Sequence, residues 1–445
     1  MVISQKLFIS SIVFFLLLLC TASCNTTEPP PDKTVLTLTL EDVSCTEAWV
    51  TLTTNNLQLP AILNLLKDNT ITKTINLQTA DTLLYIDSLL PNTSYQYQVT
   101  SIQSATGGPV SSNELSVTTL DTTSHNFTWQ TFEFGQHSSS TLYDVAIIDE
   151  NNIWAVGEIY MLDTLGNPDH TTYNAVHWDG QKWELKRITV NFRGGLITPP
   201  LEGVFAFSCT DIWFVGSLPI RGDGANWTIY DLRTTIDPSL TLSKAWGRSS
   251  NDMYFVGRNG NIAHWNGVKW TKIESGISLD IHDIWGSNEM KSNDYEIIAI
   301  ASNIFTNDGK EVIRISNGSV QKLSTNGLSA YFEGIWFKSG RRYYVVGGGI
   351  HTKQNINFEK NWYRYPAGVI NYHYSTSVRG NDLNDIFIAG SAGEILHYNG
   401  YGWKNYLEEI TLTNGGLLEI KINKNQAATV GYNGSKAIIF LGKRN

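Results

Sequence analysis

The fold is decided by one recurring stretch of sequence, which reads DMYFVGRNGNIAHWNGVKW from Asp252 to Trp270. It returns without gaps from Asp385 to Trp403 as DIFIAGSAGEILHYNGYGW, and a shorter copy, ATVGYNGSKAIIF, spans Ala428 to Phe440. Short apolar and aromatic runs between glycine-containing turns are typical of β-strands in hairpins. Each copy predicts a strand, a glycine turn, a second strand, a tight hairpin at two residues that tolerate positive φ, and an outer strand that begins at Trp.

Looser copies extend this repeat over most of the chain. Each unit opens with an apolar run, for example Leu142–Ile147 or His282–Trp285, so a unit holds four antiparallel strands. The last small residue of each core recurs 41 to 59 residues apart, at Gly157, Gly216, Gly257, Ala301, Gly347, Gly390 and Gly431. This period is close to that of propeller blades. We therefore expect a seven-bladed β-propeller over residues 125–445, with six or eight blades as alternatives.

The two ends of the repeat region complement each other. The last unit stops after its third strand, near Ile438–Phe440, whereas His125–Phe132 is a strand without a unit and carries Trp129. Pairing these two segments would complete one blade and remove the exposed edge that an open sheet leaves. We expect the ring to be closed in this way.

The composition favours an all-β protein and argues against several other classes. Of the 445 residues, 42% are hydrophobic and only 16% are charged, and the formal net charge is −9. Low charge with many aromatic residues argues against long helices and against disorder. An acidic balance without a run of Lys and Arg argues against a nucleic-acid partner. Four cysteines are too few for a disulfide framework, and Cys45 and Cys209 are expected to be separate thiols.

A second β region precedes the repeats. Residues 34–120 contain short alternating runs, beginning with Val35–Leu40, at the spacing of a β-sandwich. Within this region, the spacing of Leu89, Pro91, Thr93 and Tyr95 resembles the tyrosine corner of fibronectin type III domains. The resemblance implies a fibronectin III-like domain in which the Tyr hydroxyl bonds to the chain upstream. Such domains are usually spacers or adhesion modules, and no catalytic residue is indicated here.

The N-terminus has the order of an export signal. Lys6, the apolar run Leu7–Cys20 and the small residues Thr21-Ala22-Ser23 predict a signal peptide over residues 1–23. Its ending on Cys24 resembles a bacterial lipoprotein signal, which implies lipidation of Cys24 and anchoring to a membrane of the cell envelope. Residues 24–33 are polar and rich in proline and are expected to form a spacer. Without lipidation of Cys24, the protein would be secreted.

The blade pattern resembles a broad class of bacterial propellers, similar to sialidase-type repeat proteins and to photosystem assembly factors. The Asp-box of sialidases is absent, since Asp179–Trp183 carries only its tail. The resemblance therefore implies the propeller fold and names no catalytic residue.

Residues that break the repeat are the best candidates for function. Large rings with polar tips can stack on sugars or proteins, and irregular aromatic-rich segments supply possible ligand-contact loops at Tyr363, Tyr365, Tyr372 and Tyr374. Histidines that occupy one repeated position are instead expected to serve blade packing, which applies to His177, His264 and His397. The sequence indicates no catalytic motif, no metal site and no cofactor.

These observations predict a non-catalytic surface lipoprotein that acts as a binding or scaffold module for an envelope protein or glycan. The first alternative is a propeller glycoside hydrolase or polysaccharide lyase, in which carboxylates gather at the central channel. Possible contributors are Glu202, Glu333 and Glu394. The second alternative is an assembly factor for an envelope complex.

Overall fold

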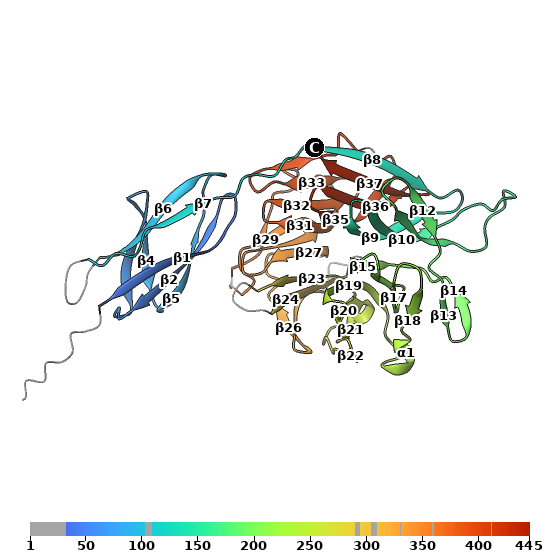
Figure 1. Cartoon of the computed structure of the whole chain (residues 1–445), viewed down its shortest axis with the longest axis horizontal. Helices are drawn as coiled ribbons and strands as arrows, with labels where there is room; N and C mark the ends of the chain where they lie inside the picture. The colour runs from blue at the N-terminus through green and yellow to red at the C-terminus, as the bar shows by residue number, and fades with distance from the viewer. Residues whose placement is uncertain are drawn as a thin grey trace, which may run out of the picture. The chain divides into compact units, whose positions relative to one another are not determined.

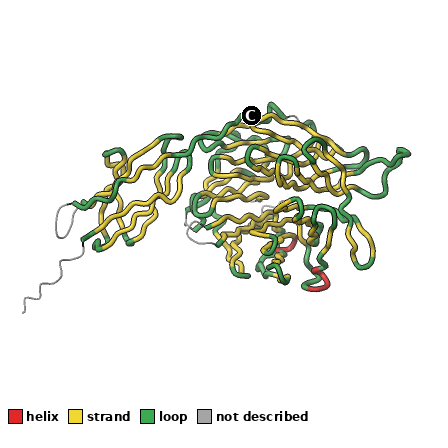
Figure 2. Tube along the Cα trace, in the orientation of Figure 1, coloured by secondary structure: helices red, strands yellow, loops and turns green. Residues whose placement is uncertain are grey.

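The computed structural model describes residues 33–102, 109–289, 294–303, 309–329, 331–357, 360–410 and 412–445. Strands dominate these residues, and the helical elements are the short α1 (Leu232–Thr235) and the 3-10 turn η1 (Arg258–Gly260) (Figure 2). The predicted all-β class is confirmed. No helix in the described ranges is long and apolar enough to cross a membrane. The expected signal peptide, residues 24–32 of the spacer and the lipidation site Cys24 lie outside the described residues.

The chain divides into two compact units, the larger of which contains all of residues 115–445. Strands β1–β7 form two sheets of their own, with the orders β1-β2-β5 and β4-β3-β6-β7. The backbone N–H of Leu90 donates to the hydroxyl of Tyr95 over 2.9 Å, which is the bond expected of a tyrosine corner. The bounds of these strands are β1 (Val35–Val43), β2 (Ala48–Asn55), β3 (Ala61–Lys67), β4 (Thr70–Leu77), β5 (Asp81–Ile86), β6 (Ser94–Ser101) and β7 (Leu115–Thr118).

Most of the remaining strands form four-stranded antiparallel sheets of strands consecutive in the chain. These sheets are β9–β12 (Thr141–Asp149, Asn152–Ile159, Tyr173–Trp178, Trp183–Lys186), β15–β18 (Gly203–Ser208, Asp211–Val215, Pro219–Gly222, Trp227–Ile229), β19–β22 (Leu242–Ser249, Asp252–Gly257, Ile262–Trp265, Trp270–Lys272), β23–β26 (Ile281–Asn288, Tyr295–Ser302, Lys310–Ser316, Ser319–Leu323), β27–β30 (Phe332–Lys338, Arg342–Gly347, Ile350–Lys353, Tyr363–Arg364) and β31–β34 (Ser375–Asp382, Asp385–Gly390, Ile395–Tyr398, Trp403–Asn405). A separate hairpin joins β13 (Val190–Phe192) to β14 (Gly195–Ile197).

One further four-stranded sheet combines segments from far apart in the sequence. It consists of β35 (Gly415–Asn423), β36 (Gln426–Asn433), β37 (Lys436–Arg444) and β8 (Phe127–Phe134). The pairing of β37 with β8 is antiparallel and continuous from Ala437–Phe134 to Arg444–Phe127, and Figure 1 shows the two strands side by side. The outer edge of this sheet is therefore supplied by residues that precede the first repeat.

The first strands of successive sheets contact one another in the order β9, β15, β19, β23, β27, β31, β35 and back to β9. The second strand of each sheet is almost wholly buried, as in β20 and β32. Apolar clusters span neighbouring sheets, so that Trp154 of β10, for example, packs with Phe214 of β16. Because each sheet is covered on both faces, its second strand is apolar at consecutive positions, and this explains why the repeat lacks strict alternation there.

The hairpins at the repeated Asx-Gly pairs differ in one respect from the expectation. Gly180, Gly267 and Gly400 adopt positive φ, but the preceding Asp or Asn does not. The Asx side chain instead accepts hydrogen bonds from the backbone N–H groups two and three residues later, as at Asn266 with Val268 and Lys269. The turn thus uses the side chain as a cap and needs a glycine at only one position. A smaller difference concerns the predicted start of each outer strand at Trp, since Trp362 precedes β30 and Trp129 is the third residue of β8.

The repeated histidines have the packing role that the sequence predicts. His264 lies 2.6 Å from the Asp252 carboxylate and stacks on Tyr254, and His397 lies 3.0 Å from Asp385 and stacks on Phe387. Each pair joins the third strand of a sheet to the second. The two cysteines in the described ranges, Cys45 and Cys209, are unpaired thiols as expected.

A further buried histidine predicts how stability depends on pH. The side chain of His351 is fully buried, its Nε2 faces the N–H and hydroxyl of Ser329, and its Nδ1 faces the Val345 carbonyl. Burial lowers the pKa of His351 to about 4, whereas an unfolded chain holds it near 6.5. The unfolded state therefore binds more protons between these values, so stability decreases as pH falls from about 6.5 to about 4.

We expect protonation of His351 to cost the wild type about 2–3 kcal/mol of stability between pH 7 and pH 4. The variant His351→Asn should not show this part of the loss. Urea denaturation at several pH values measures this difference. The control is His170→Asn, because His170 is exposed. Parallel pH profiles for His351→Asn and the wild type would contradict the prediction.

Candidate functional site

The candidate site is built by a bulge that recurs in the first strand of each sheet. The register against the second strand shifts by one residue in β9, β19, β23, β27, β31 and β35. A bulge of this kind re-aims a side chain out of the regular alternation. The residues left unpaired are Tyr143, Ser243, His282, Glu333, Thr376 and Leu418. Glu202 holds the equivalent place directly before β15, where its N–H donates to the Val215 carbonyl.

These seven residues line a single cavity of about 380 Å³, which we call the central cavity. Pro200, Glu158 and Arg258 complete its wall, together with Lys244 and Glu419 from the first strands. The backbone feature is constant from sheet to sheet, whereas the side chain it presents differs each time. The residue at a bulge makes no ladder hydrogen bond, so its side chain can differ between sheets without disturbing the strands. These positions are therefore free to suit a ligand.

A layer of buried charge lies next to the central cavity. Lys244 pairs with Asp144 over 3.2 Å and with Glu419 over 2.8 Å. Arg379 holds both carboxylate oxygens of Asp283 at 2.8 Å. The guanidinium also lies 3.4 Å from Glu419. This charged belt has three acidic and three basic members and is neutral when all are ionised: Asp144, Asp283, Glu419, Lys244, Arg379 and Lys421.

The pKa values in the charged belt follow from burial and from the opposite charges. Burial opposes the charge on Lys244, but the carboxylates of Asp144 and Glu419 outweigh it and hold the Lys244 pKa above its ordinary value. Burial likewise opposes the charge on Glu419, and Arg379 and Lys244 outweigh it, so the Glu419 pKa lies well below its usual range. These groups stabilise one another, and the belt needs no external ion.

The charges on the rest of the cavity wall are not balanced. Arg258 lies 3.6 Å from Glu202, and the Tyr143 hydroxyl donates to Glu158 over 3.5 Å. In the described part of the chain, no Lys, Arg or His lies within ion-pair distance of Glu158 or Glu333. Burial raises the pKa of the Glu333 carboxyl, and His282, the Tyr374 hydroxyl and Lys244 partly offset this rise. The wall therefore has more acidic than basic groups.

The structure separates the four predicted tyrosines. Tyr363 begins the outer strand β30, is 57% exposed and contacts the ring of Tyr365 edge-on. Tyr372 is exposed and its backbone N–H donates to Glu394. Tyr374 lies next to the central cavity, where its hydroxyl interacts with the Glu333 carboxylate, and burial together with this carboxylate raises the Tyr374 pKa.

The three candidate carboxylates also fall into two groups. Glu202 and Glu333 both line the central cavity. Glu394 does not, since it accepts hydrogen bonds from the N–H groups of Tyr372 and His373 and from the Asn405 side chain. Glu394 is therefore occupied in holding a loop. Among the residues the structure describes, no three His, Cys, Asp or Glu side chains are grouped so that they could hold a metal ion.

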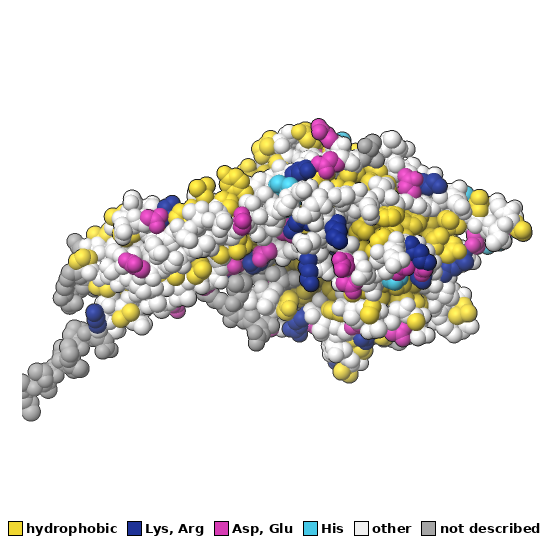
Figure 3. All heavy atoms as spheres, turned by 45° about the horizontal axis from the view of Figure 1, so that its top comes forward, with side chains coloured by type: hydrophobic (Ala, Val, Ile, Leu, Met, Phe, Trp, Pro, Cys, Tyr) yellow, Lys and Arg dark blue, Asp and Glu magenta, His cyan; other side chains and the backbone are white. Residues whose placement is uncertain are grey.

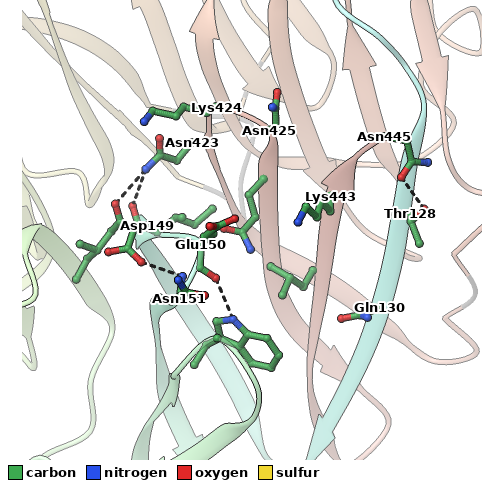
Figure 4. A pocket seen from close by; sticks show the side chains of 16 residues that line it. Thr128, Gln130, Asp149, Glu150, Asn151, Asn423, Lys424, Asn425, Lys443 and Asn445 are labelled. Atoms are coloured by element: carbon green, nitrogen blue, oxygen red, sulfur yellow. Dashed lines mark hydrogen bonds between the residues drawn. The ribbon is translucent and has the colours of Figure 1, made fainter.

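A larger cavity, of about 750 Å³, lies where the sheet β9–β12 meets β37 and β8 (Figure 4). Several of its polar groups are already engaged: Asn423 donates to the carbonyls of Ile147 and Ile148, and Thr128 donates to Asn445. Its charged members, Asp149, Glu150, Lys424 and Lys443, balance one another. We regard the smaller central cavity as the better candidate, because it combines an unbalanced charge with positions that vary on a constant backbone.

Surface charge elsewhere does not single out another site. On the face shown in Figure 3, acidic and basic side chains lie interspersed over the molecule rather than in one patch of a single sign. Exposed ion pairs such as Arg193–Asp231 and Lys322–Glu311 are of this kind.

Comparisons with known proteins define the fold class. No protein-family model matches the chain, and no curated protein is similar to it in sequence. It is similar to a structure described as YCF48 bound to D1 peptide, at 17% identity and a TM-score of 0.52, over 71% of this chain and 97% of that one. YCF48 from Cyanidioschyzon merolae gives 16% identity and a TM-score of 0.50, over 71% and 98%. The C-terminal WD40 domain of Sif2 covers 78% of this chain and 91% of its own, with 10% identity and a TM-score of 0.42. The two YCF48 matches and the circle of four-stranded sheets show a fold of the propeller type, and identities this low show the fold alone.

Sequence reasoning missed most of the central cavity. Tyr143, Ser243, His282, Thr376 and Leu418 are ordinary residues in apolar segments, and no motif marks them. If the units are aligned on their first strands, rather than on the Gly and Trp positions, the bulge residues form one variable position. The next position is often charged, as at Asp144, Lys244 and Asp283.

Proposed function

We propose that this chain is an exported, lipid-anchored envelope protein in which a fibronectin III-like domain precedes a seven-bladed β-propeller, and that the propeller binds a segment of another envelope protein at the central cavity. The observation that carries the proposal is the constant bulge with a different side chain in each sheet. The circle of contacts among first strands and the pairing of β8 with β37 support seven blades and closure. The Tyr95–Leu90 bond supports the fibronectin III-like assignment.

A protein ligand is favoured over a glycan by one comparison. The structural neighbour YCF48 is described as bound to a D1 peptide, so a protein of similar fold binds a peptide. A cavity of about 380 Å³ is within the range of about 300–1,000 Å³ found for small ligand sites, and it can hold one or two side chains of such a segment. A scaffold role, including assistance in assembling an envelope complex, would use the same contact.

The test uses a displayed library of random dodecapeptides selected on the whole protein. Ser243 is at a bulge, so Ser243→Trp fills the central cavity, and we expect it to weaken the selected peptides about tenfold or more, equivalent to 1.4 kcal/mol. Val268→Trp is the matched control, because Val268 is 85% exposed in a distant hairpin. Fluorescence anisotropy measures both. Peptides that bind Ser243→Trp and the wild type equally, or the failure to select any peptide, would contradict the proposal.

A glycoside hydrolase is the second candidate, and a specific observation favours it: Glu202 and Glu333 line one cavity together with Arg258. Paired carboxylates are the chemistry that glycosidases require, one as acid and one as base or nucleophile. The raised pKa of Glu333 suits the acid. Release of reducing ends from envelope polysaccharides by the wild type, and its loss in both Glu202→Gln and Glu333→Gln, would establish this activity in place of simple binding.

A further inference from the structure

Among the described residues, the central cavity presents acidic groups that form no ion pair with a basic group. The charged belt is balanced within itself, so it leaves no net charge for the cavity. Of the other acidic lining residues, Glu202 is partnered by Arg258, whereas Glu158 and Glu333 have no cationic partner in the described ranges. A ligand that brings a positive charge would therefore gain more here than a neutral or anionic one.

Glu333 is one of the two acidic lining residues without a cationic partner in the described ranges. It is positioned by the bulge in β27, between Phe332 and Gly334, so its carboxylate is directed away from the sheet and into the cavity wall. A buried carboxylate without a counterion is costly unless it is paired and hydrogen-bonded. The hydroxyl of Tyr374 lies beside this carboxylate and interacts with it. A hydroxyl supplies no positive charge, so Glu333 remains without a cationic partner in the described ranges.

The geometry favours an organic cation over a metal ion. A bare divalent cation needs several oxygen ligands at about 2.0–2.6 Å, and no such grouping exists among the described residues. A guanidinium or ammonium group on a flexible stem makes longer contacts and donates several hydrogen bonds. The ring of Tyr143, which lies beside Glu158 in the cavity wall, adds an aromatic face that a cation can approach.

We propose that the central cavity takes the cationic side chain of an Arg or Lys residue from the bound protein segment, with Glu333 and Glu158 as its acceptors. This inference rests on the proposed function, because it names the feature of the segment that the site recognises. The apolar residues Pro200 and Leu418 in the same wall contact the methylene stem, as long cationic side chains commonly require.

Two displayed dodecapeptide libraries test this inference separately from the proposed function. One library contains Arg and Lys at random positions, and the other excludes both residues. We expect only the first to yield peptides whose binding is lost in Ser243→Trp. If the library without Arg and Lys yields equally tight peptides that Ser243→Trp also blocks, the proposed function stands and the cation inference is wrong. If neither library yields a peptide sensitive to Ser243→Trp, both are wrong.

A second measurement identifies the acceptor. The selected peptides are resynthesised with each Arg replaced by citrulline, which keeps the shape and removes the charge. We expect citrulline in the peptide and Glu333→Gln in the protein each to weaken binding about tenfold or more, and their combination to add little beyond either. Glu133→Gln makes the same charge change at an exposed position on β8 and should leave binding unchanged. Equal binding of the Arg and citrulline peptides, or equal loss in Glu133→Gln and Glu333→Gln, would overturn the inference.

Discussion

Replacing Arg379 with methionine is expected to lower the free energy of unfolding by about 3–5 kcal/mol, because the substitution leaves buried carboxylates without their counter-charge. Arg379 is 4% exposed and bonds both oxygens of Asp283, which is itself almost fully buried. It also approaches Glu419 and donates to the Ile335 carbonyl. Methionine preserves much of the apolar stem, so the loss is mainly that of the ion pair. Chemical denaturation followed by Trp fluorescence measures the change.

Two further variants separate the buried charge from a general effect of losing an arginine. Arg193 forms a comparable contact with Asp231, at 2.8 Å, but its side chain is 58% exposed. Since exposed ion pairs contribute little, Arg193→Met should leave the denaturation midpoint unchanged. The double variant Arg379→Met/Asp283→Asn removes both members of the buried pair and should be less destabilised than the sum of its parts. Equal midpoints for Arg379→Met and Arg193→Met would show that the belt does not support the fold.

The belt also connects stability with the candidate site. Lys244 and Glu419 belong to both, and each is held by partners on other first strands. Because these charges neutralise each other, the acidic groups of the cavity wall are not screened by a nearby excess of positive charge. A variant that unbalances the belt should therefore lower stability as well as change ligand binding, whereas Glu333→Gln should weaken binding without lowering stability.

The fold could be predicted from the sequence because the repeat places its signals at positions that the backbone requires. Glycine at the end of the second strand, Asx-Gly in the hairpin and Trp near the outer strand recur at one period, and the strands follow them closely. In the unit with Ala301, the outer strand β26 (Ser319–Leu323) contains no Trp, so only the period of the repeat predicts this strand. Local pattern decides the strands, and tertiary packing decides their exact ends.

The candidate site could not be predicted in the same way, for a physical reason. A bulge is a change in hydrogen-bond register between two paired strands, so the sequence of one strand alone does not show where a bulge lies. His282 and Thr376 therefore looked like interior residues of apolar runs. The low overall charge of the sequence likewise gives no sign that Asp144, Asp283 and Glu419 are buried in the first strands. Of the predicted loop tyrosines, only Tyr374 lies beside the cavity.

Removing residues 436–445 is expected to abolish cooperative unfolding of the repeat region. These residues include β37, the strand between β36 and β8. They bury Ile438, Ile439, Phe440 and Leu441, all at most 6% exposed. Each such side chain contributes about 1.5–3 kcal/mol on burial, so the loss approaches the whole stability of a typical protein, about 5–15 kcal/mol. Both neighbouring strands would also lose their ladder hydrogen bonds and become exposed edges.

A chain that lacks only Asn445 is the matched control and should unfold close to the midpoint of the full chain, because Asn445 follows the strand and its side chain makes only exposed hydrogen bonds, to Thr128 and Asn126. A synthetic peptide of residues 436–445 should restore cooperative unfolding to the shortened chain by adding the missing strand between β36 and β8. Trp178 and Trp183 pack in the same cluster as Ile439 and Leu441, so their fluorescence reports the repair directly. If the shortened chain unfolds at the midpoint of the full chain without the peptide, then the ring does not depend on closure through β37 and β8.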